Sequence, residues 1–254
     1  MNIVWVHRHG PQFASYRYRA EMPAVEVAKI NGYKTSVNNG EADIVIFSKP
    51  QEDELVMAQN AKAEGAKIVV DLSDDHFQHD DLQKRFAELA DGIVVGTDTM
   101  RARVYDYTKK DSVAIPDPYE AEECEPHADG DDYLWFGHSS NFKALISVFP
   151  SMKGRKLRVV TGPKVSEGSI LWTPENMAQA FKLSNIVVLP TLAGQEFKTH
   201  NRLLNSIRSG CFAVCMGHPA YLEFKNHVWV GNFPTGLRWA EHFRKDLNGL
   251  VKGA

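Results

Sequence analysis

The densest group of polar side chains is Asp74, Asp75 and His76, which follow an apolar run ending at Leu72. Adjacent carboxylates beside an imidazole can orient sugar hydroxyls, act in acid–base chemistry or bind a metal ion. The sequence does not choose among these roles, and a carboxylate that caps a following helix is the structural alternative. We take the three as candidate catalytic residues. We expect no metal, because no His/Cys spacing matches a zinc motif.

A pair of basic residues opens a predicted helix in the second half of the chain. Lys198 and Arg202 are four residues apart, so they would share a helix face. Cations near a helix N-terminus oppose the helix dipole, and we interpret them as binding a diphosphate. Exposed surface charge is the alternative.

A second phosphate-binding element is a glycine directly after a predicted strand. Backbone N–H groups, hydroxyls and a helix N-terminus can hold phosphate at such a loop. The loop has neither a Walker nor a GxGxxG pattern, and a tight turn is the alternative. The predicted nucleotide-binding residues are those of this loop and of the second half's helix starts: Gly137, His138, Ser139, Asn141, Lys198, Asn201, Arg202 and Glu223.

Basic residues also follow strands of the first half. Arg17 and Arg19 lie near a loop-to-helix start, where a guanidinium fork suits an anionic group. Lys49 follows the next predicted strand. We take these three residues as candidate ligand-binding residues, with solvated surface charge as the alternative.

Short apolar segments alternate with amphipathic ones along the first half. Continuous Val- and Ile-rich runs predict strands that are buried on both faces of a parallel sheet. The predicted strands are Asn2–His7, Asp43–Ser48, Lys67–Leu72, Gly92–Gly96 and Ser112–Ile115. The predicted helices are Ala20–Asn31, Glu52–Glu64, Asp80–Ala90 and Thr97–Tyr107. This alternation is typical of a doubly wound α/β domain.

The alternation stops at Pro116 and resumes at Tyr133. The second half predicts strands at Tyr133–Phe136, Leu157–Thr161, Ile186–Pro190, Phe212–Met216 and His227–Val230. It predicts helices at Asn141–Phe149, Pro174–Leu183, Lys198–Ser209, Pro219–Phe224 and Thr235–Val251. We therefore expect an α/β protein of two Rossmann-like doubly wound domains facing across a cleft: a first domain at 1–116, an acidic linker at 117–132, a second domain at 133–234, and a terminal helix at 235–254, for which packing back on the first domain is one alternative.

Composition narrows the class of protein. Hydrophobic residues make up 43% and charged residues 24% of the 254 residues, which is typical of a globular protein. No apolar run is long enough to predict a membrane span, and no signal peptide is expected. Three cysteines without a CxxC pair favour a reducing compartment, so we expect a cytoplasmic protein.

Charge is uneven along the chain. Residues 1–120 hold 14 basic and 20 acidic side chains, a balance of −6; residues 121–132 add −6, and residues 133–254 hold 15 basic and 6 acidic ones, a balance of +9. A protein that binds DNA must neutralise the phosphate charges of the DNA. Because residues 1–120 are acidic overall, we expect no nucleic-acid partner. A peripheral contact of the terminal helix with a membrane is left open, although its mixed charge weakens that idea.

The order and spacing of several segments resemble a glycosyltransferase of the GT-B fold, in a short form similar to the retaining, family-four-like group. The resemblance spans most of the chain. The segments that carry it are SYRYRAEMPAVEVAKINGY, DIVIFSKP, KIVVDLSDDHF, ADGIVVGTDTMRARV, VAIPDP, YLWFGHSSNF, NIVVLP, KTHNRLLNSIRSGCFAV and PAYLEF.

The resemblance implies a nucleoside-diphosphate sugar as co-substrate, of UDP or GDP type, with no bound cofactor or metal. It implies a nucleotide-sugar-binding domain at 133–234 and an acceptor-side domain at 1–116, in which Arg17, Arg19 and Lys49 would contact the acceptor. Gly137 and its loop would approach the diphosphate, Lys198 and Arg202 would neutralise it, and the Asp74–His76 group would face the sugar or a saccharide or other small acceptor. One departure is Asn205, which stands where the family commonly has a glutamate. The implied function is sugar transfer with retention. Two alternatives remain, a catalytically inactive nucleotide- or sugar-binding remnant acting as a partner or scaffold, and a phage-type DNA glucosyltransferase.

Overall fold

A computed structural model describes residues 1–78, 81–126, 130, 132–162, 167–243 and 246. Its contacts divide the chain into two units. The first unit contains Met1–Pro118 together with Phe197–Thr199, and the second contains Tyr119–Glu196 and His200–Ala254. A three-residue segment from the second half of the sequence therefore belongs to the first unit.

The first unit is built on a six-stranded, fully parallel sheet. Its strand order is β2-β1-β3-β4-β5-β6. The strands are β1 Asn2–Val6, β2 Lys34–Val37, β3 Ile44–Ser48, β4 Lys67–Leu72, β5 Gly92–Val95 and β6 Val113–Ala114. The apolar runs of this half form β1 and β3 to β6. The sequence did not predict β2, an edge strand whose residues Lys34–Val37 are exposed or half-buried.

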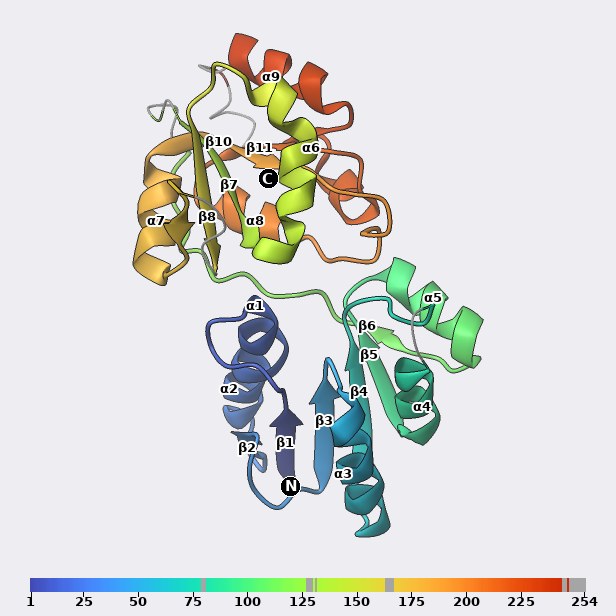
Figure 1. The fold of residues 1–254 in the computed structure, drawn as a ribbon. Coiled ribbons are helices and arrows are strands. Elements are labelled where there is room, and N and C mark those ends of the chain that lie inside the picture. The colour runs from blue at the N-terminus through green and yellow to red at the C-terminus, as the bar shows by residue number, and fades with distance from the viewer. Residues whose placement is uncertain (79–80, 127–129, 131, 163–166, 244–245, 247–254) are drawn as a thin grey trace. The chain divides into compact units, whose positions relative to one another are not determined.

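Helices cover both faces of this sheet (Figure 1). Alternate β1 residues face opposite ways: Val4 and Val6 pack with α3, α4 and α5, whereas Ile3 and Trp5 pack with the helices before β2. Those earlier helices form one continuous run of α1 Ala14–Tyr16, η1 Arg17–Glu21 and α2 Met22–Ala28, in which η1 is a π-helix. The others are α3 Glu52–Ala63, α4 Leu82–Leu89 and α5 Asp98–Thr108.

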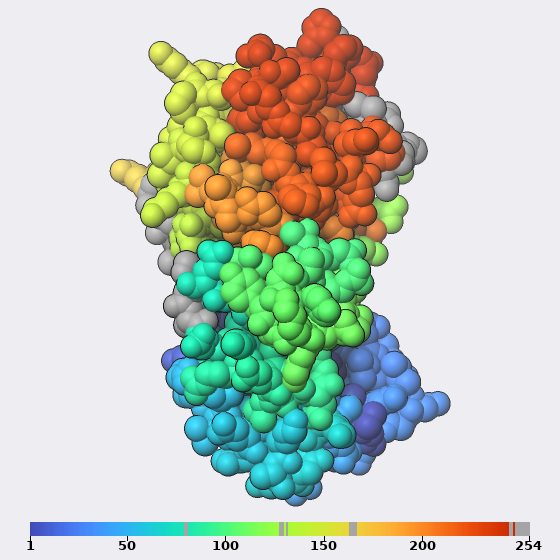
Figure 2. Space-filling view, turned by 90° about the vertical axis from the view of Figure 1, so that its right-hand side faces the viewer, coloured from blue at the N-terminus to red at the C-terminus, as the bar shows by residue number. Residues whose placement is uncertain are grey.

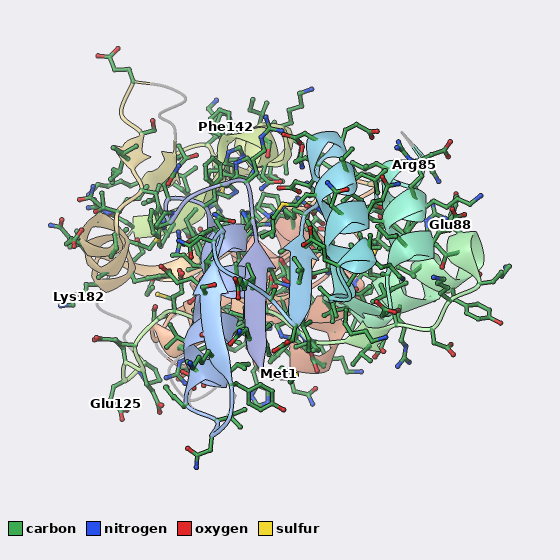
Figure 3. All side chains as sticks on the ribbon, turned by 90° about the horizontal axis from the view of Figure 1, so that it is seen from below. Met1, Arg85, Glu88, Glu125, Phe142 and Lys182 are labelled. Atoms are coloured by element: carbon green, nitrogen blue, oxygen red, sulfur yellow. The ribbon has the colours of Figure 1, made fainter. Side chains whose placement is uncertain are left out.

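The outer surface of α3 to α5 carries charged residues together with the exposed apolar side chains of Val56 and Met57 on α3. These helices cover one side of the first unit in Figure 2, where they are coloured cyan to green. Arg85 and Glu88 lie on the outer side of α4 (Figure 3), and Arg85 pairs with Glu52 of α3 at 2.6 Å. The apolar residues of α4, among them Phe86 and Ala87, are buried against the sheet.

The second unit has another fully parallel six-stranded sheet, with the strand order β12-β11-β10-β7-β8-β9. Numbered within the unit this is the order 6-5-4-1-2-3 of dinucleotide-binding folds. The strands are β7 Asp132–His138, β8 Leu157–Gly162, β9 Ile170–Leu171, β10 Ser184–Leu189, β11 Phe212–Cys215 and β12 Trp229–Val230. Because β9 has only two residues, the sequence pattern did not reveal it.

Two clusters of buried residues lie on opposite faces of the second sheet. Trp135 and Phe212 belong to the face that packs on α6 Phe142–Met152 and α9 Phe233–His242. Phe136 and Ala213 belong to the face that packs on α7 Pro174–Lys182, α8 Asn201–Arg208 and the 3₁₀ helix η3 Pro219–Phe224. A further 3₁₀ helix, η2 Ser139–Asn141, precedes α6.

The prediction of two Rossmann-like doubly wound sheets is confirmed. Two helix assignments differ. The helix predicted from Lys198 begins only at Asn201 as α8, and the one predicted from Ala20 begins at Ala14. The predicted terminal helix Thr235–Val251 is observed as α9 Phe233–His242, which packs on β11, β12 and α6 of its own unit. Its expected continuation falls on residues 244–245 and 247–251, which lie outside the described residues.

Candidate functional site

Each sheet has one point where the chain connections leave in opposite directions. Ligands of open α/β sheets bind at the carboxyl ends of the strands beside such a point. In the first sheet it lies between β1 and β3, and in the second between β7 and β10. The residues that follow these four strands are therefore the candidates for ligand binding.

At the switch point of the second sheet, the loops after β7 and β10 contact each other. Gln195 Nε2 donates to Asn141 Oδ1 over 3.1 Å. His218 Nε2 lies 2.7 Å from the carbonyl oxygen of Gln195, and the Nδ1 of His218 accepts the N–H of Ala220, so the Nε2 carries the hydrogen. The buried His218 thus fixes the loop that faces the predicted phosphate-binding loop.

Arg202 reaches the same strand end from the first turn of α8. Its Nη1 lies 3.5 Å from the carbonyl oxygen of Phe136, and a Cβ built on Gly137 would lie 3.4 Å from this nitrogen. The buried phenol of Tyr221 also hydrogen-bonds Arg202. The guanidinium is therefore held beside Gly137 at the carboxyl end of β7, as the sequence analysis expects for a diphosphate ligand.

Gly137 lies within β7, which extends to His138, and not directly after the strand as predicted; Ser139–Asn141 then form η2 rather than the start of an α-helix. His138 Nδ1 accepts the backbone N–H of Ser140 and lies 2.9 Å from the hydroxyl of Ser140. Ser139 and Asn141 are the ends of this short helix. The structure brings the loop, Arg202 and the amino end of α8 to one sheet edge.

Glu223 and Asn201 lie in the second unit, with different surroundings. Glu223 Oε1 is 3.1 Å from Nδ1 of His200, and its side chain is 62% exposed. Asn201 is the first residue of α8, and its carbonyl oxygen accepts a hydrogen bond from Asn205 Nδ2. No described contact tests the predicted nucleotide-binding role of either residue, and that role stays a prediction.

Lys198 does not share a helix face with Arg202, and this geometric prediction is wrong. It precedes α8 and belongs, with Phe197 and Thr199, to the first unit. The i, i+4 spacing gave a common face only on the assumption that the helix began at Lys198. Lys198 instead lies close enough to Asp74 to lower the pKa of that carboxyl group.

The Phe197–Thr199 segment is anchored on the first unit by contacts on both of its ends. Thr97 Oγ1 donates to the carbonyl oxygen of Phe197, and Arg103 lies over the Phe197 ring at 5.5 Å. The hydroxyl of Thr199 donates to Asp117. These contacts hold Lys198 between two fixed neighbours.

Asp74 is paired with Lys49 in the first unit, with 2.6 Å between Oδ2 and Nζ. Burial alone would raise the pKa of Asp74, but Lys49 and Lys198 hold it below its usual range. Asp74 is therefore a carboxylate at neutral pH, suited to accept a hydrogen bond or a proton and not to donate one. Lys49, at the end of β3, has a left-handed φ of +52°, which is uncommon for a residue with a side chain.

Asp75 has a structural role that the sequence analysis did not expect. Its Oδ2 accepts from Arg103 Nε at 2.8 Å, and its Oδ1 accepts the N–H of Phe77. The backbone N–H of His76 donates a hydrogen bond to Oε1 of Gln83. We therefore remove Asp75 from the candidate catalytic residues. The helix-cap alternative is also wrong for this segment, because α4 begins only at Leu82.

Arg19 is likewise not available to an acceptor. Its side chain is only 5% exposed. Nε and Nη2 bind both oxygens of Asp71 at 2.7 Å, and Nη1 donates to the carbonyl of Ile115 and to Asp117. The π-helix η1 contains Arg19. Arg17 donates to the carbonyl of Pro11 and remains half-exposed.

Asn205, the departure from the family pattern, holds the segment that follows Pro118. Its Oδ1 accepts the N–H groups of both Glu120 and Ala121, at 3.0 and 2.8 Å. Its Nδ2 donates to the carbonyl of Asn201. An amide can make both kinds of bond at once, whereas a carboxylate cannot donate. The asparagine is thus explained by local structure.

Among the described residues, no group of three or more His, Cys, Asp or Glu side chains is arranged to hold a metal ion. None of the helices described is long and apolar enough to cross a membrane.

Comparison with known proteins extends the fold assignment. No protein-family model and no curated protein matches the sequence. Among solved structures, the chain is similar to an alpha-glucosyltransferase in complex with UDP-glucose and DNA containing an abasic site, with a TM-score of 0.64 and 10% identity over 99% of this chain and 93% of that one. It is also similar to an alpha1,3-fucosyltransferase, with a TM-score of 0.59 and 9% identity over 98% and 80% of the two chains.

A third similar structure is a protein proposed to be a UDP-N-acetylglucosamine 2-epimerase, from Listeria monocytogenes. Its TM-score is 0.56 at 8% identity, over 100% of this chain and 91% of that one. At such identities the similarity establishes the fold and not the reaction. The chain therefore has the GT-B fold, while membership of the retaining, family-four-like group is not established.

The expectation that nucleic acid is excluded as a partner is wrong. The same fold occurs over nearly the full length of a protein solved with DNA. We excluded nucleic acid because the net charge of residues 1–120 is negative. A net charge does not describe the charge of any one face of the unit.

Proposed function

We propose that this protein transfers a sugar from a nucleoside-diphosphate sugar to a hydroxyl group of an acceptor. The observation that carries the proposal is the placement of Arg202 beside Gly137 at the switch point of the second sheet. A cation and a helix N-terminus at one strand end suit a diphosphate. The GT-B fold, found in proteins solved with UDP-glucose and with GDP, supports the same donor class.

In the proposed reaction, the bond between the sugar's anomeric carbon and the diphosphate oxygen breaks, and the electron pair stays on the diphosphate. Arg202 and the amino end of α8 stabilise that developing charge. The acceptor oxygen forms the new glycosidic bond, and its proton goes to the departing diphosphate, whose leaving oxygen has kept the electron pair. Asp74, ionised beside Lys49, is suited to orient the acceptor hydroxyl. Retention of anomeric configuration rests on the sequence resemblance alone.

DNA is the second candidate acceptor. The specific observation in its favour is the similarity over 99% of this chain to a glucosyltransferase solved with DNA. A saccharide acceptor is the first candidate because the residues near Asp74 include paired charges rather than a row of free cations. The inactive-remnant alternative loses its main argument, because Asn205 has a structural role.

A thermal-shift screen against UDP, GDP, ADP, CMP, dTDP and their sugars tests the donor site. A ligand that binds only the folded protein raises its stability by about 2.7 kcal/mol at 100 times its Kd. We expect one nucleotide to raise the Tm, and Arg202→Ala to abolish most of that rise. Arg238→Ala, which changes an exposed arginine on α9 of the same unit, is the matched control.

Transfer is then measured with the nucleotide sugar that binds, using methyl glucosides and duplex DNA with or without hydroxymethylated cytosines as acceptors. Sugar incorporation into one acceptor class supports the enzyme and identifies the class. Binding without transfer or hydrolysis would support the remnant instead. A protein that binds no nucleotide would contradict the proposal.

A further inference from the structure

The first sheet has its own switch point, and His7 stands beside it. β1 ends at Val6 and β3 ends at Ser48, so His7 and Lys49 follow the two strands between which the connections diverge. This is the position at which open α/β sheets bind their ligands. His7 is not among the site residues that the sequence analysis predicts.

Contacts to both its backbone and its ring fix His7. The amide of Asn38 accepts the backbone N–H of His7 at 2.8 Å and donates to its carbonyl at 3.0 Å. Asn38 itself has a left-handed φ of +64°, an unusual conformation that the surrounding structure must maintain. The ring's Nδ1 accepts the backbone N–H of His9 at 3.1 Å.

The bond to Nδ1 assigns the tautomer. A ring nitrogen that accepts a hydrogen bond carries no hydrogen, so the hydrogen of the neutral imidazole is on Nε2. Burial, together with the positive charges of His9 and Lys49, lowers the pKa of His7 to about 4. The ring is therefore neutral near pH 7, with one N–H in a fixed direction.

That N–H has no partner among the described residues. The side chain of His7 is 1% exposed, and its Nε2 is buried without a hydrogen bond. A buried donor without a partner destabilises a folded protein, and buried polar groups are nearly always paired. The Tyr16 ring lies at right angles to the His7 ring, with 5.7 Å between the two ring centroids, and Lys49 is close enough to act on the pKa of His7.

We propose that His7 is a positioning residue, whose Nε2–H donates a hydrogen bond to an uncharged oxygen, a hydroxyl of the acceptor, at the switch point of the first sheet. A neutral donor beside an already paired Lys49 suits a hydroxyl better than a free anion. The inference deepens the proposed function, because it rests on the acceptor binding to the first unit. It adds a residue that follows β1 and would act with Asp74, which follows β4 of the same sheet.

Two substitutions separate binding from folding. His7→Phe fills the same space without a donor, so it removes the unpaired N–H, and we expect its Tm to stay near that of the wild type. His7→Gln retains an amide N–H near the position of Nε2. In transfer assays with methyl glucoside or hydroxymethylated duplex DNA, His7→Phe should raise the acceptor KM about tenfold. In His7→Gln the acceptor KM should lie within about threefold of the wild-type value. The KM for the nucleotide sugar should not change in either variant.

An NMR measurement reads the same hydrogen directly. The Nε2–H signal of His7, assigned by its loss in His7→Phe, should shift when the acceptor probe is added to protein saturated with nucleotide. An unshifted signal with every hydroxyl-bearing probe, or an unchanged acceptor KM in His7→Phe, would overturn the inference while leaving the proposed function standing. Absence of any nucleotide binding would instead overturn the proposed function, and this inference with it.

Discussion

Arg19 binds both carboxylate oxygens of Asp71, with Nε–Oδ2 and Nη2–Oδ1 distances of 2.7 Å. Breaking such a buried pair from one side leaves an uncompensated charge and costs about 3–5 kcal/mol. We therefore expect Asp71→Asn to lower the free energy of unfolding by that amount, as measured by urea denaturation. Arg19→Lys should also destabilise, because an ammonium cannot form the planar fork.

The control for this pair is Arg17→Lys, which changes a half-exposed arginine two residues away. It should alter stability by less than about 0.5 kcal/mol, as surface substitutions usually do. If Arg19→Lys were equally harmless, the buried pair would not hold the π-helix to the sheet.

Gly96 leaves room for Thr199. A Cβ at position 96 would lie 2.5 Å from the Thr199 Cγ2 methyl group, closer than packed atoms approach. Gly96→Ala should therefore destabilise the protein by about 1–3 kcal/mol through overpacking. Thr199→Ser removes that methyl group and retains the hydroxyl that binds Asp117.

The double variant Gly96→Ala/Thr199→Ser should recover most of the stability lost in Gly96→Ala. Denaturation of both single variants and the double variant gives the coupling free energy between the two sites. Additive effects would mean that the Phe197–Thr199 segment does not occupy this position in solution.

The ring of His7 predicts a pH dependence of stability. Its pKa is about 4 in the folded protein and 6.5 in the reference state, so below pH 6.5 the unfolded chain binds the proton first. Stability is therefore lost as the pH falls from about 6.5 to 4. The two cationic neighbours, His9 and Lys49, act in the same direction.

The non-titrating variant His7→Gln isolates this effect from other groups. Between pH 7 and 4.5, the wild type should lose about 2–3 kcal/mol more than His7→Gln, from the difference in pKa. Equal losses in urea denaturation at the two pH values would show that the imidazole is not buried as described.

Asn205 should matter for stability and not for catalysis. Asn205→Leu leaves the N–H groups of Glu120 and Ala121 without their acceptor, which should cost about 1–3 kcal/mol. Asn205→Asp retains both accepted bonds and loses only the bond to Asn201, so it should destabilise less. Asn205→Glu, which introduces the glutamate common in the family that the sequence resembles, should not raise transfer activity. An activity gain there would revive the idea of a degenerate enzyme.

The apolar runs predicted the architecture well. Strands such as Lys67–Leu72 are buried on both faces, so composition alone marks them. The missed strands are β2, which is partly polar at a sheet edge, and β9, which has two residues. In both, hydrogen bonding to a neighbouring strand decides the structure, and the local sequence carries little of that information.

The candidate site was less predictable, because residue type does not reveal a long-range partner. Arg19 and Arg17 look alike in sequence, yet only Arg19 meets Asp71, 52 positions away. Lys198 and Arg202 have helical spacing, but the docking of Phe197 and Thr199 keeps Lys198 out of α8. The signal that indicates His7, a missing hydrogen-bond partner, exists only in three dimensions.

The attachment of Phe197–Thr199 to the first unit also has a consequence for synthesis on the ribosome. When residue 118 leaves the exit tunnel, the first unit still lacks the segment that binds Thr97 and Asp117. That segment follows about 80 residues later, a delay of roughly 4–16 s at usual elongation rates. The nascent first unit would meanwhile expose an incomplete surface, so cutting the gene at residue 118 should yield an amino-terminal fragment that is easily digested by proteases.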